Sequence, residues 1–213
     1  MKQVRFLMVG GFLGAGKTTL LAKAAERLAA RGKRVGLITN DQATHLVDTA
    51  ILAETGSPVQ EVSGGCFCCR FQDLVAAADG LIRQSDPDIV IGEPVGSCTD
   101  LSATVLQPLK QLYGELFRLA SFSVLVDPSR LREALADGAA SQFPDSVLYI
   151  FRKQIEEADL IVINKCDTLS PAGLAELEAM ARRHCPDTPV LALSALRGDG
   201  LDAWLGRMAA DRP

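Results

Sequence analysis

A glycine-rich segment near the amino terminus limits the possible folds of this chain more than any other feature. Residues Gly11-Phe12-Leu13-Gly14-Ala15-Gly16-Lys17-Thr18 fit the pattern G-x-x-x-x-G-K-[ST]. The apolar run 4–9 before them is typical of a buried strand, and residues 19–28 after them are typical of a helix closed by Gly32. A glycine loop between a strand and a helix directs backbone N–H groups and the positive end of the helix dipole at one point, which suits a polyphosphate.

The same segment predicts roles for its polar groups. Lys17 is expected to reach the β- and γ-phosphates, and the Thr18 hydroxyl is expected to bind Mg²⁺. The alternative is a glycine turn with an incidental lysine, which would not need a strand and a helix on either side. The residues expected to bind phosphate through their backbone are Gly11, Gly14, Ala15 and Gly16.

Composition indicates the general class of protein. With 213 residues, of which 48% are apolar and 23% charged, the sequence predicts a single globular domain over residues 1–213 without a separate C-terminal domain. The formal net charge of −4 gives no reason to expect nucleic-acid binding. No segment is long and apolar enough to span a bilayer, and the first residues lack a signal pattern, so we expect no membrane association and a cytoplasmic location.

Short apolar runs alternate with longer amphipathic segments along the whole chain. This alternation predicts an α/β fold, a doubly wound and mostly parallel sheet of the P-loop NTPase type with helices on both faces. After the first strand, the predicted strands are 34–39, 59–62, 88–91, 122–126, 160–163 and 189–193. After the first helix, the predicted helices are 44–53, 72–84, 101–117, 144–157, 171–183 and 201–210.

Polar motifs follow five of these predicted strands directly. Besides the glycine loop they are Asn40-Asp41, Glu93, Asn164-Lys165-Cys166-Asp167 and Ser194-Ala195. In doubly wound sheets, ligands bind beyond the carboxyl ends of the strands. The motifs therefore predict one nucleotide site at a single edge of the sheet.

Two of these motifs predict recognition of guanine. Asn164-Lys165-Cys166-Asp167 matches N-K-x-D, in which the last carboxylate accepts hydrogen bonds from guanine N1–H and the 2-amino group. The lysine stem is expected to lie over the base. Ser194-Ala195-Leu196 resembles the S-A-[KL] segment of GTPases, in which a backbone N–H meets guanine O6. The alternative for N-K-x-D is a chance helix cap.

Two carboxylates are candidates for the hydrolytic chemistry. In Glu93-Pro94-Val95-Gly96, the carboxylate would hold Mg²⁺ or orient the attacking water, and the Gly96 N–H would meet the γ-phosphate. A plain turn is the alternative. Asp41 is a second candidate for the Mg²⁺ shell, with helix capping as its alternative.

Three of the 6 cysteines lie within Gly65-Cys66-Phe67-Cys68-Cys69. Thiolates select soft or borderline metals such as Zn²⁺ or Cu⁺, so Cys66, Cys68 and Cys69 are expected to bind one transition-metal ion, most readily Zn²⁺. A fourth position would be filled by water, His45, a carboxylate or a second chain. The alternative is that the three are small buried side chains. The scattered cysteines, read as packing residues, are Cys98, Cys166 and Cys185.

Taken together, these residues resemble the CobW/HypB/UreG family of metallochaperone GTPases, and its CobW-like branch most of all. The resemblance implies a Mg²⁺-dependent GTPase that binds GTP and GDP and couples nucleotide state to delivery of a transition metal. It also implies a client metalloenzyme or partner chaperone and a nucleotide-dependent homodimer. The family usually carries a further C-terminal domain. The matching pieces are Gly11-Phe12-Leu13-Gly14-Ala15-Gly16-Lys17-Thr18-Thr19, Gly65-Cys66-Phe67-Cys68-Cys69, Glu93-Pro94-Val95-Gly96, Asp127, Gln154-Ile155 with Ala158-Asp159, and Asn164-Lys165-Cys166-Asp167.

One segment departs from the family pattern, and two other functions compete with the GTPase hypothesis. Residues Gly92-Glu93-Pro94-Val95-Gly96-Ser97-Cys98 differ from the more usual E-[TS]-[ST]-G. A P-loop kinase acting on a small molecule would release nucleoside diphosphate only with an acceptor and would have little need of Asp167. A nucleotide-gated interaction module would hydrolyse GTP slowly until a partner is added.

Overall fold

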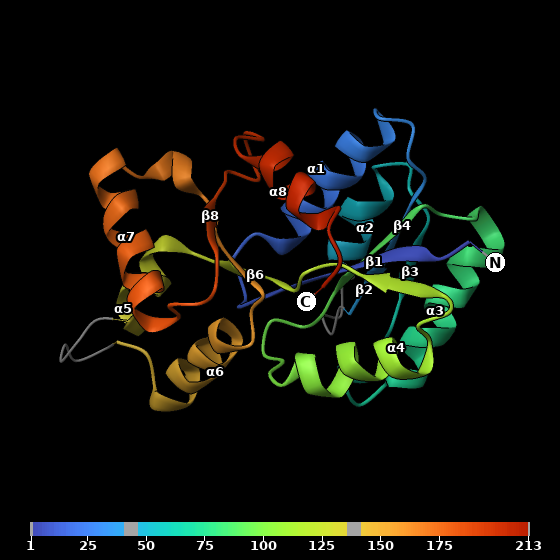
Figure 1. Ribbon diagram of the computed structural model, residues 1–213, viewed down its shortest axis with the longest axis horizontal. Helices are drawn as coiled ribbons and strands as arrows, with labels where there is room; N and C mark the ends of the chain where they lie inside the picture. Colours follow the sequence, from blue (N-terminus) through green and yellow to red (C-terminus); the bar gives the residue numbers. More distant parts are fainter. Residues whose placement is uncertain (1, 41–46, 136–141, 213) are drawn as a thin grey trace.

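We describe the computed structural model of the chain for residues 2–40, 47–135 and 142–212. One eight-stranded sheet runs through the molecule in the order β3-β2-β4-β1-β6-β7-β8, and β5 pairs with β1 beside β6 (Figure 1). The pairings between these strands are all parallel, as the alternation of strands and helices predicted. The strands are β1 Val4–Gly11, β2 Val35–Thr39, β3 Val59–Glu61, β4 Ile89–Glu93, β5 Phe117–Leu119, β6 Ser123–Val126, β7 Leu160–Ile163 and β8 Val190–Ala192.

Helices cover both faces of this sheet, which confirms the predicted doubly wound architecture. One core contains Leu20 and Leu21 of α1, Leu52 of α2 and Trp204 of α8. The other is built by α3, α4, α5, α6 and α7. The helices are α1 Lys17–Ala29, α2 Val47–Ala53, α3 Phe71–Ser85, η1 Ser102–Leu106, α4 Gln107–Leu112, α5 Pro128–Leu135, α6 Asp145–Glu156, η2 Cys166–Thr168, α7 Pro171–His184 and α8 Leu201–Met208. Among the described residues, no helix is long and apolar enough to cross a membrane.

The largest difference from the predicted elements lies between residues 101 and 119. One helix was expected over 101–117, whereas the chain forms the π-helical turn η1, the short helix α4 and the strand β5. Pro108 has no N–H group to donate to the carbonyl four residues earlier, which interrupts a continuous α-helix. In β5, Phe117 and Leu119 are buried on either side of the exposed Arg118, so this end of the segment follows the period of a strand.

Two further elements also differ from prediction. The helix α5 was not expected, although Pro128 stands at its first position and Asp127 Oδ1 accepts hydrogen bonds from Ser129 N and Arg130 N. The strand β4 does not stop at Ile91 but continues through Glu93, because its last residues pair with Ile38 and Thr39 of β2.

Candidate nucleotide and metal site

The glycine loop joins β1 to α1 at the carboxyl end of the sheet, as the sequence predicted. Gly11, Gly14 and Gly16 have φ angles of 129°, 78° and 93°, which L side chains rarely adopt. The loop is also closely packed. A Cβ atom on Gly11 would lie 2.3 Å from the Leu125 carbonyl oxygen, and one on Gly16 would lie 2.3 Å from Asn164 Nδ2. Glycine is therefore required at both positions for the loop to keep this shape.

Polar side chains meet where α1 begins and β4 ends. Thr18 Oγ1 donates a hydrogen bond of 3.1 Å to Glu93 Oε1, and Lys17 Nζ lies 3.8 Å from the same oxygen. Lys17 is 7% exposed and Glu93 is 5% exposed, so this cation and carboxylate face each other away from bulk water. A hydroxyl beside a carboxylate offers the hard oxygen ligands that Mg²⁺ prefers. Asp41, the other predicted Mg²⁺ ligand, lies outside the described residues, and so does His45.

Asn164 connects the glycine loop to the segment after β8. Its Nδ2 donates to the Ala15 carbonyl at 2.7 Å, and its Oδ1 accepts from Ala195 N at 2.9 Å. Both ends of the amide are thus used inside the protein, and Asn164 is 2% exposed. The sequence assigned Asn164 and Ala195 to the nucleotide. In this structure they connect the glycine loop to the segment after β8. Their contact with guanine stays a prediction.

Of the N-K-x-D motif, Lys165 contacts the glycine loop and Asp167 contacts the segment after β8. Lys165 has a left-handed backbone with φ 57°, and its Nζ donates to the Gly14 carbonyl at 2.9 Å and to Asp127 Oδ2 at 2.7 Å. The pKa of Asp167 is lowered, first by a hydrogen bond from the Ser194 side chain and also by the charge of Arg197. Arg197 Nε lies 3.5 Å from Asp167 Oδ2. Asp167 is therefore held as a carboxylate, the form that accepts hydrogen bonds.

Arg130 is a neighbour of the loop that the sequence did not suggest. Its guanidinium lies 5.1 Å from the centre of the Phe12 ring and donates to the Leu13 carbonyl. Arg130 lies in the first turn of α5. The only sequence signal for this helix was Asp127-Pro128, which is typical of a helix start. The residue adds a cation to the outer side of the loop.

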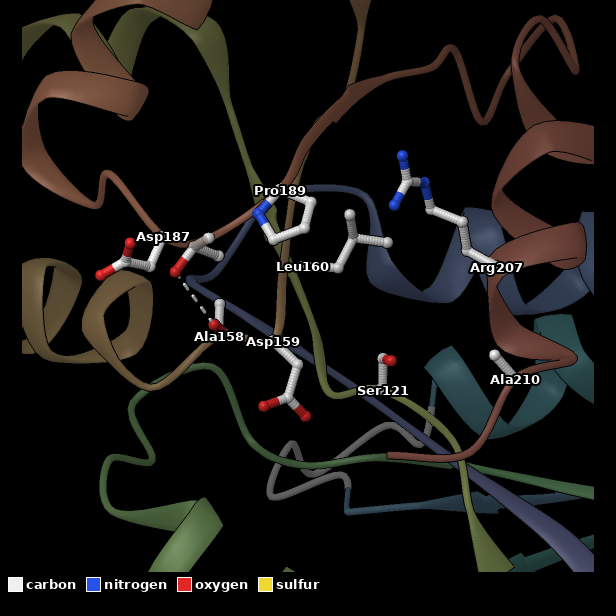
Figure 2. A pocket seen from close by; sticks show the side chains of 9 residues that line it. Ser121, Ala158, Asp159, Leu160, Asp187, Pro189, Arg207 and Ala210 are labelled. Atoms are coloured by element: carbon white, nitrogen blue, oxygen red, sulfur yellow. Dashed lines mark hydrogen bonds between the residues drawn. The ribbon is translucent and has the colours of Figure 1, made fainter. Parts of the chain in front are cut away.

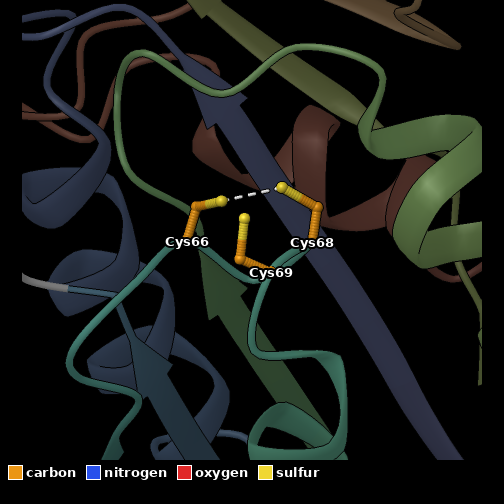
Figure 3. Close-up of side chains that lie close together, drawn as sticks. All are labelled: Cys66, Cys68 and Cys69. Carbon is orange, nitrogen blue, oxygen red and sulfur yellow. Dashed lines mark hydrogen bonds between the residues drawn. The ribbon is translucent and has the colours of Figure 1, made fainter.

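The three clustered cysteines lie in the loop between β3 and α3, and their side chains converge (Figure 3). Their sulfur atoms all lie within 4.8 Å of one another, and Cys66 Sγ is 2.7 Å from Cys68 Sγ. Phe67 between them is fully buried and anchors the loop in the core. The three sulfur atoms are therefore close enough to bind a single ion, and sulfur ligands favour soft metals.

Asn40 at the end of β2 holds this cysteine loop in place. Its Nδ2 donates to the carbonyls of Val62 and Gly65 at 2.8 and 2.7 Å, and its Oδ1 accepts from Phe67 N at 3.1 Å. Its own backbone N–H donates to the Glu93 carbonyl at 3.0 Å. Sequence reasoning placed Asn40 at a strand end but did not show that it joins the cysteine loop to the end of β4.

The cysteine thiols do not titrate alike. Burial raises the pKa of Cys66, but hydrogen bonds from Cys68, Cys69 and Cys98 outweigh it and bring the pKa down to about 7. For Cys68, burial together with the neighbouring Cys66 raises the pKa to about 12. The Cys66 thiol therefore forms a thiolate near neutral pH, whereas the Cys68 thiol keeps its proton there.

Cys98 was expected from the sequence to be a packing residue, and the structure confirms this, because it is buried in the core at 6% exposure. Burial, followed by the charges of Cys66 and Cys68, raises the pKa of its thiol.

A separate pocket of about 510 Å³ lies at the opposite edge of the sheet (Figure 2). Ser121 precedes β6, Asp159 precedes β7 and Pro189 precedes β8, so the pocket is lined at the amino ends of these strands. Asp159 in its wall already accepts hydrogen bonds from Phe122 N and Arg212 Nε. The pocket is therefore lined by residues other than those of the glycine loop and the cysteine cluster.

A parallel sheet, a glycine loop between its central strand and a helix, and an N-K-x-D motif at the same edge define a P-loop nucleotide-binding domain. The chain belongs to the CobW/HypB/UreG family, because the model of the family's nucleotide-binding domain matches residues 5–192. The resemblance inferred from the motifs is thereby confirmed.

Individual relatives agree with this assignment. The zinc chaperone YeiR of Escherichia coli is 29% identical over 191 residues, which cover 86% of this chain and 53% of that protein. Hydrogenase maturation factor HypB of Azotobacter chroococcum is 30% identical over 202 residues, which cover 93% of this chain and 57% of that protein. The chain thus spans about half the length of these relatives. The crystal structure of HypB from Helicobacter pylori in complex with nickel shares the fold, with a TM-score of 0.64 at 16% identity, covering 95% of this chain and 84% of that one.

Proposed function

We propose that this chain is a GTP-hydrolysing metallochaperone domain that loads a transition metal, Zn²⁺ foremost, at Cys66, Cys68 and Cys69. The observation that carries the proposal is a series of contacts from Thr18 at the start of α1 to the backbone of the cysteine loop. Thr18 contacts the Glu93 side chain, the Glu93 carbonyl accepts from Asn40, and Asn40 holds the cysteine loop. A change at the phosphates thus has a short structural path to the metal ligands.

The phosphate side of the site would work mainly by charge. Lys17, with the loop N–H groups, would stabilise the charge that develops on the transferring phosphoryl group. Thr18 and Glu93 would hold Mg²⁺, with Asp41 as a further candidate, and Glu93 would also orient the attacking water. An Mg²⁺ ion held by these residues would neutralise charge at the phosphate oxygens. Thr19 and the Gly96 N–H complete the set of residues assigned to the phosphates.

Asp167 should decide which base is bound. We expect GTP to bind at least tenfold more tightly than ATP, a difference of about 1.4 kcal/mol or more, because adenine lacks the donor pair that the carboxylate accepts. Asp167→Asn should weaken GTP and strengthen xanthosine triphosphate, since an amide reverses the pairing pattern. Fluorescent nucleotide titration measures both effects. Asp199→Asn, the same change at a nearby exposed carboxylate, is the control, and equal affinity of the wild type for ATP and GTP would refute base reading.

The cysteine cluster would bind the metal ion temporarily, as cargo to be delivered. A thiolate available near neutral pH and two neighbouring sulfurs suit capture and release of Zn²⁺. The ion would pass to a client metalloenzyme or a partner chaperone. A nucleotide-dependent homodimer would bring a second copy to the site.

Coupling between the two sites is the direct test of the proposal. A non-hydrolysable GTP analogue should tighten Zn²⁺ binding by roughly 5- to 150-fold, about 1–3 kcal/mol, and GDP should not. The physical reason is that segments contacting the γ-phosphate are ordered by it and released on hydrolysis. By linkage, Zn²⁺ must tighten the analogue by the same factor.

The measurement is a competition titration of Zn²⁺ against a chromogenic chelator with the GTP analogue, with GDP and without nucleotide. The matching ATP analogue serves as the control for a nonspecific effect of triphosphate. Light scattering on the same samples reports whether a dimer forms. Identical Zn²⁺ affinities in all nucleotide conditions would mean that the sites are independent and would overturn the chaperone mechanism.

A further inference from the structure

Three successive carbonyl groups of the glycine loop each accept a hydrogen bond from a side chain outside the loop. The donors come from the segments that follow β6 and β7, far from the loop in the sequence. The donor and acceptor pairs are Arg130 with Leu13, Lys165 with Gly14 at 2.9 Å, and Asn164 with Ala15 at 2.7 Å. These carbonyl groups therefore point at the protein and not at the space that a ligand would occupy.

The direction of these carbonyl groups sets the direction of the N–H groups between them. In a trans peptide the C=O group and the following N–H group point in opposite directions, and the described peptide bonds are all trans. The contacts at the Leu13 and Ala15 carbonyls thus turn the N–H groups of Gly14 and Gly16 toward the other side of the loop. The Ala15 N–H instead donates to the Phe12 carbonyl at 3.1 Å and closes a turn. Loop N–H groups held in this way form an anion site.

We infer that Arg130 is a positioning residue for the nucleotide phosphates, which acts by holding the peptide unit between Leu13 and Gly14. The inference rests on the proposed GTP-binding function. Side-chain packing does not hold this peptide unit, because the Leu13 side chain is 72% exposed and Gly14 has no side chain. The hydrogen bond from the Arg130 guanidinium to the Leu13 carbonyl supplies the missing restraint. The Gly14 N–H then keeps one direction, as a donor to a phosphate oxygen requires.

Arg130 is itself held in place from several sides. Its guanidinium lies 5.1 Å from the centre of the Phe12 ring and 6.0 Å from the centre of the Phe143 ring, both within the range of a cation–π contact. Its backbone N–H donates to Asp127 Oδ1 at 3.4 Å, while Asp127 Oδ2 accepts from Lys165 Nζ at 2.7 Å. One carboxylate thus supports both cations that contact the loop. Arg130 is ordered before any nucleotide binds, which lowers the entropy cost of binding.

The variant that tests this role is Arg130→Met, because methionine keeps an apolar stem beside the Phe12 ring but has no charge and no donor. It should bind GDP about tenfold more weakly than the wild type, since a charge-assisted hydrogen bond that orients the loop is lost. The ³¹P resonance of the β-phosphate in bound GDP should also move, because the Gly14 N–H no longer points at it. Arg130→Lys keeps a cation and a donor and should recover most of both effects.

The matched control is Arg132→Met, which removes another guanidinium of α5, one that pairs with Glu176 instead of the loop. This variant should change neither the affinity for GDP nor the β-phosphate resonance. Titration with fluorescent GDP gives the affinity, and ³¹P spectra of the GDP-loaded proteins give the resonance. Circular dichroism shows whether each variant is folded. Arg130→Gln, which has a shorter and uncharged side chain, should behave like Arg130→Met and replaces it if that variant does not fold.

The two measurements together distinguish positioning from simple attraction by charge. Weaker GDP binding with a displaced β-phosphate resonance would support the inference. Weaker binding with an unmoved resonance would show attraction by charge alone and would overturn it, as would wild-type affinity in a folded Arg130 variant without the charge. If the wild type itself binds no GDP, the proposed nucleotide site is wrong. If the wild type binds GDP and the Arg130 variants bind it equally well, only the role of Arg130 is wrong.

Discussion

Replacement of Lys17 by alanine should lower the rate of GTP hydrolysis by about 10²–10³-fold, the usual cost of removing one group that stabilises developing charge. Lys17 is buried at the start of α1, and its Nζ lies 3.8 Å from Glu93 Oε1, so the structure holds this cation at the loop. Single-turnover release of phosphate in the presence of Mg²⁺ measures the effect on chemistry separately from binding.

Two further variants accompany this experiment, one at Lys23 on the same helix and one at Glu93, the carboxylate that faces Lys17. Lys23→Ala removes an equivalent charge from the exposed side of α1, where Lys23 pairs with Glu26, and should leave the rate unchanged. Glu93→Gln should lower the rate more than the affinity for GTP, because it keeps the hydrogen-bonding shape but loses the charge. Circular dichroism confirms that each variant is folded. Wild-type turnover in folded Lys17→Ala would show that the loop binds no reacting phosphate.

Replacement of Cys66, Cys68 and Cys69 together by serine should reduce bound metal from one ion per chain to none. If two chains share an ion, the starting value is one per dimer. A serine hydroxyl is a poor ligand for soft metals at neutral pH, so no partial site should remain. Elemental analysis of protein purified without chelator gives the metal content directly.

The fold should survive this triple replacement, which makes the result interpretable. The loop is anchored mainly by the fully buried Phe67 ring and by the hydrogen bonds of Asn40, whereas Cys66 and Cys68 are only partly buried against the core. The thermal midpoint of the metal-free variant should therefore lie close to that of the metal-free wild type. Cys166→Ser, a change within the N-K-x-D motif, is the control, and this variant should bind as much metal as the wild type. Unchanged metal content in the triple variant would refute the cysteine site.

The sequence alone was sufficient for the architecture. Alternating buried strands and amphipathic helices predicted the parallel sheet. Gly11, Lys17 and Asp167 could be proposed as site residues because their motifs are local in the chain, and their contacts with a nucleotide stay predictions. The prediction of one helix over 101–117 was wrong. The spacing of apolar residues indicates a helix but does not show that Pro108 lacks the N–H group needed to continue its hydrogen bonding.

Contacts between distant segments were the part that sequence reasoning did not predict. Asn40 lies fifty-three positions from Glu93, and the pairing of β2 with β4 brings the two residues together. The dual role of Asn40 depends on the same pairing, because its backbone and side chain reach different neighbours. Such contacts leave no periodic pattern in the chain, and they are found only once the strand order is known.

The central place of β1 has a consequence for how the chain is made. β1 ends at Gly11, while its partners β4, β5 and β6 begin at residues 89, 117 and 123. A nascent chain on the ribosome therefore carries an apolar strand with both edges open until much of the domain has been synthesised. Open edges of this kind pair with other chains, and parallel sheets close slowly. Mispairing of β1 with other chains is therefore a risk until residues 89–93 of β4 have emerged from the ribosome.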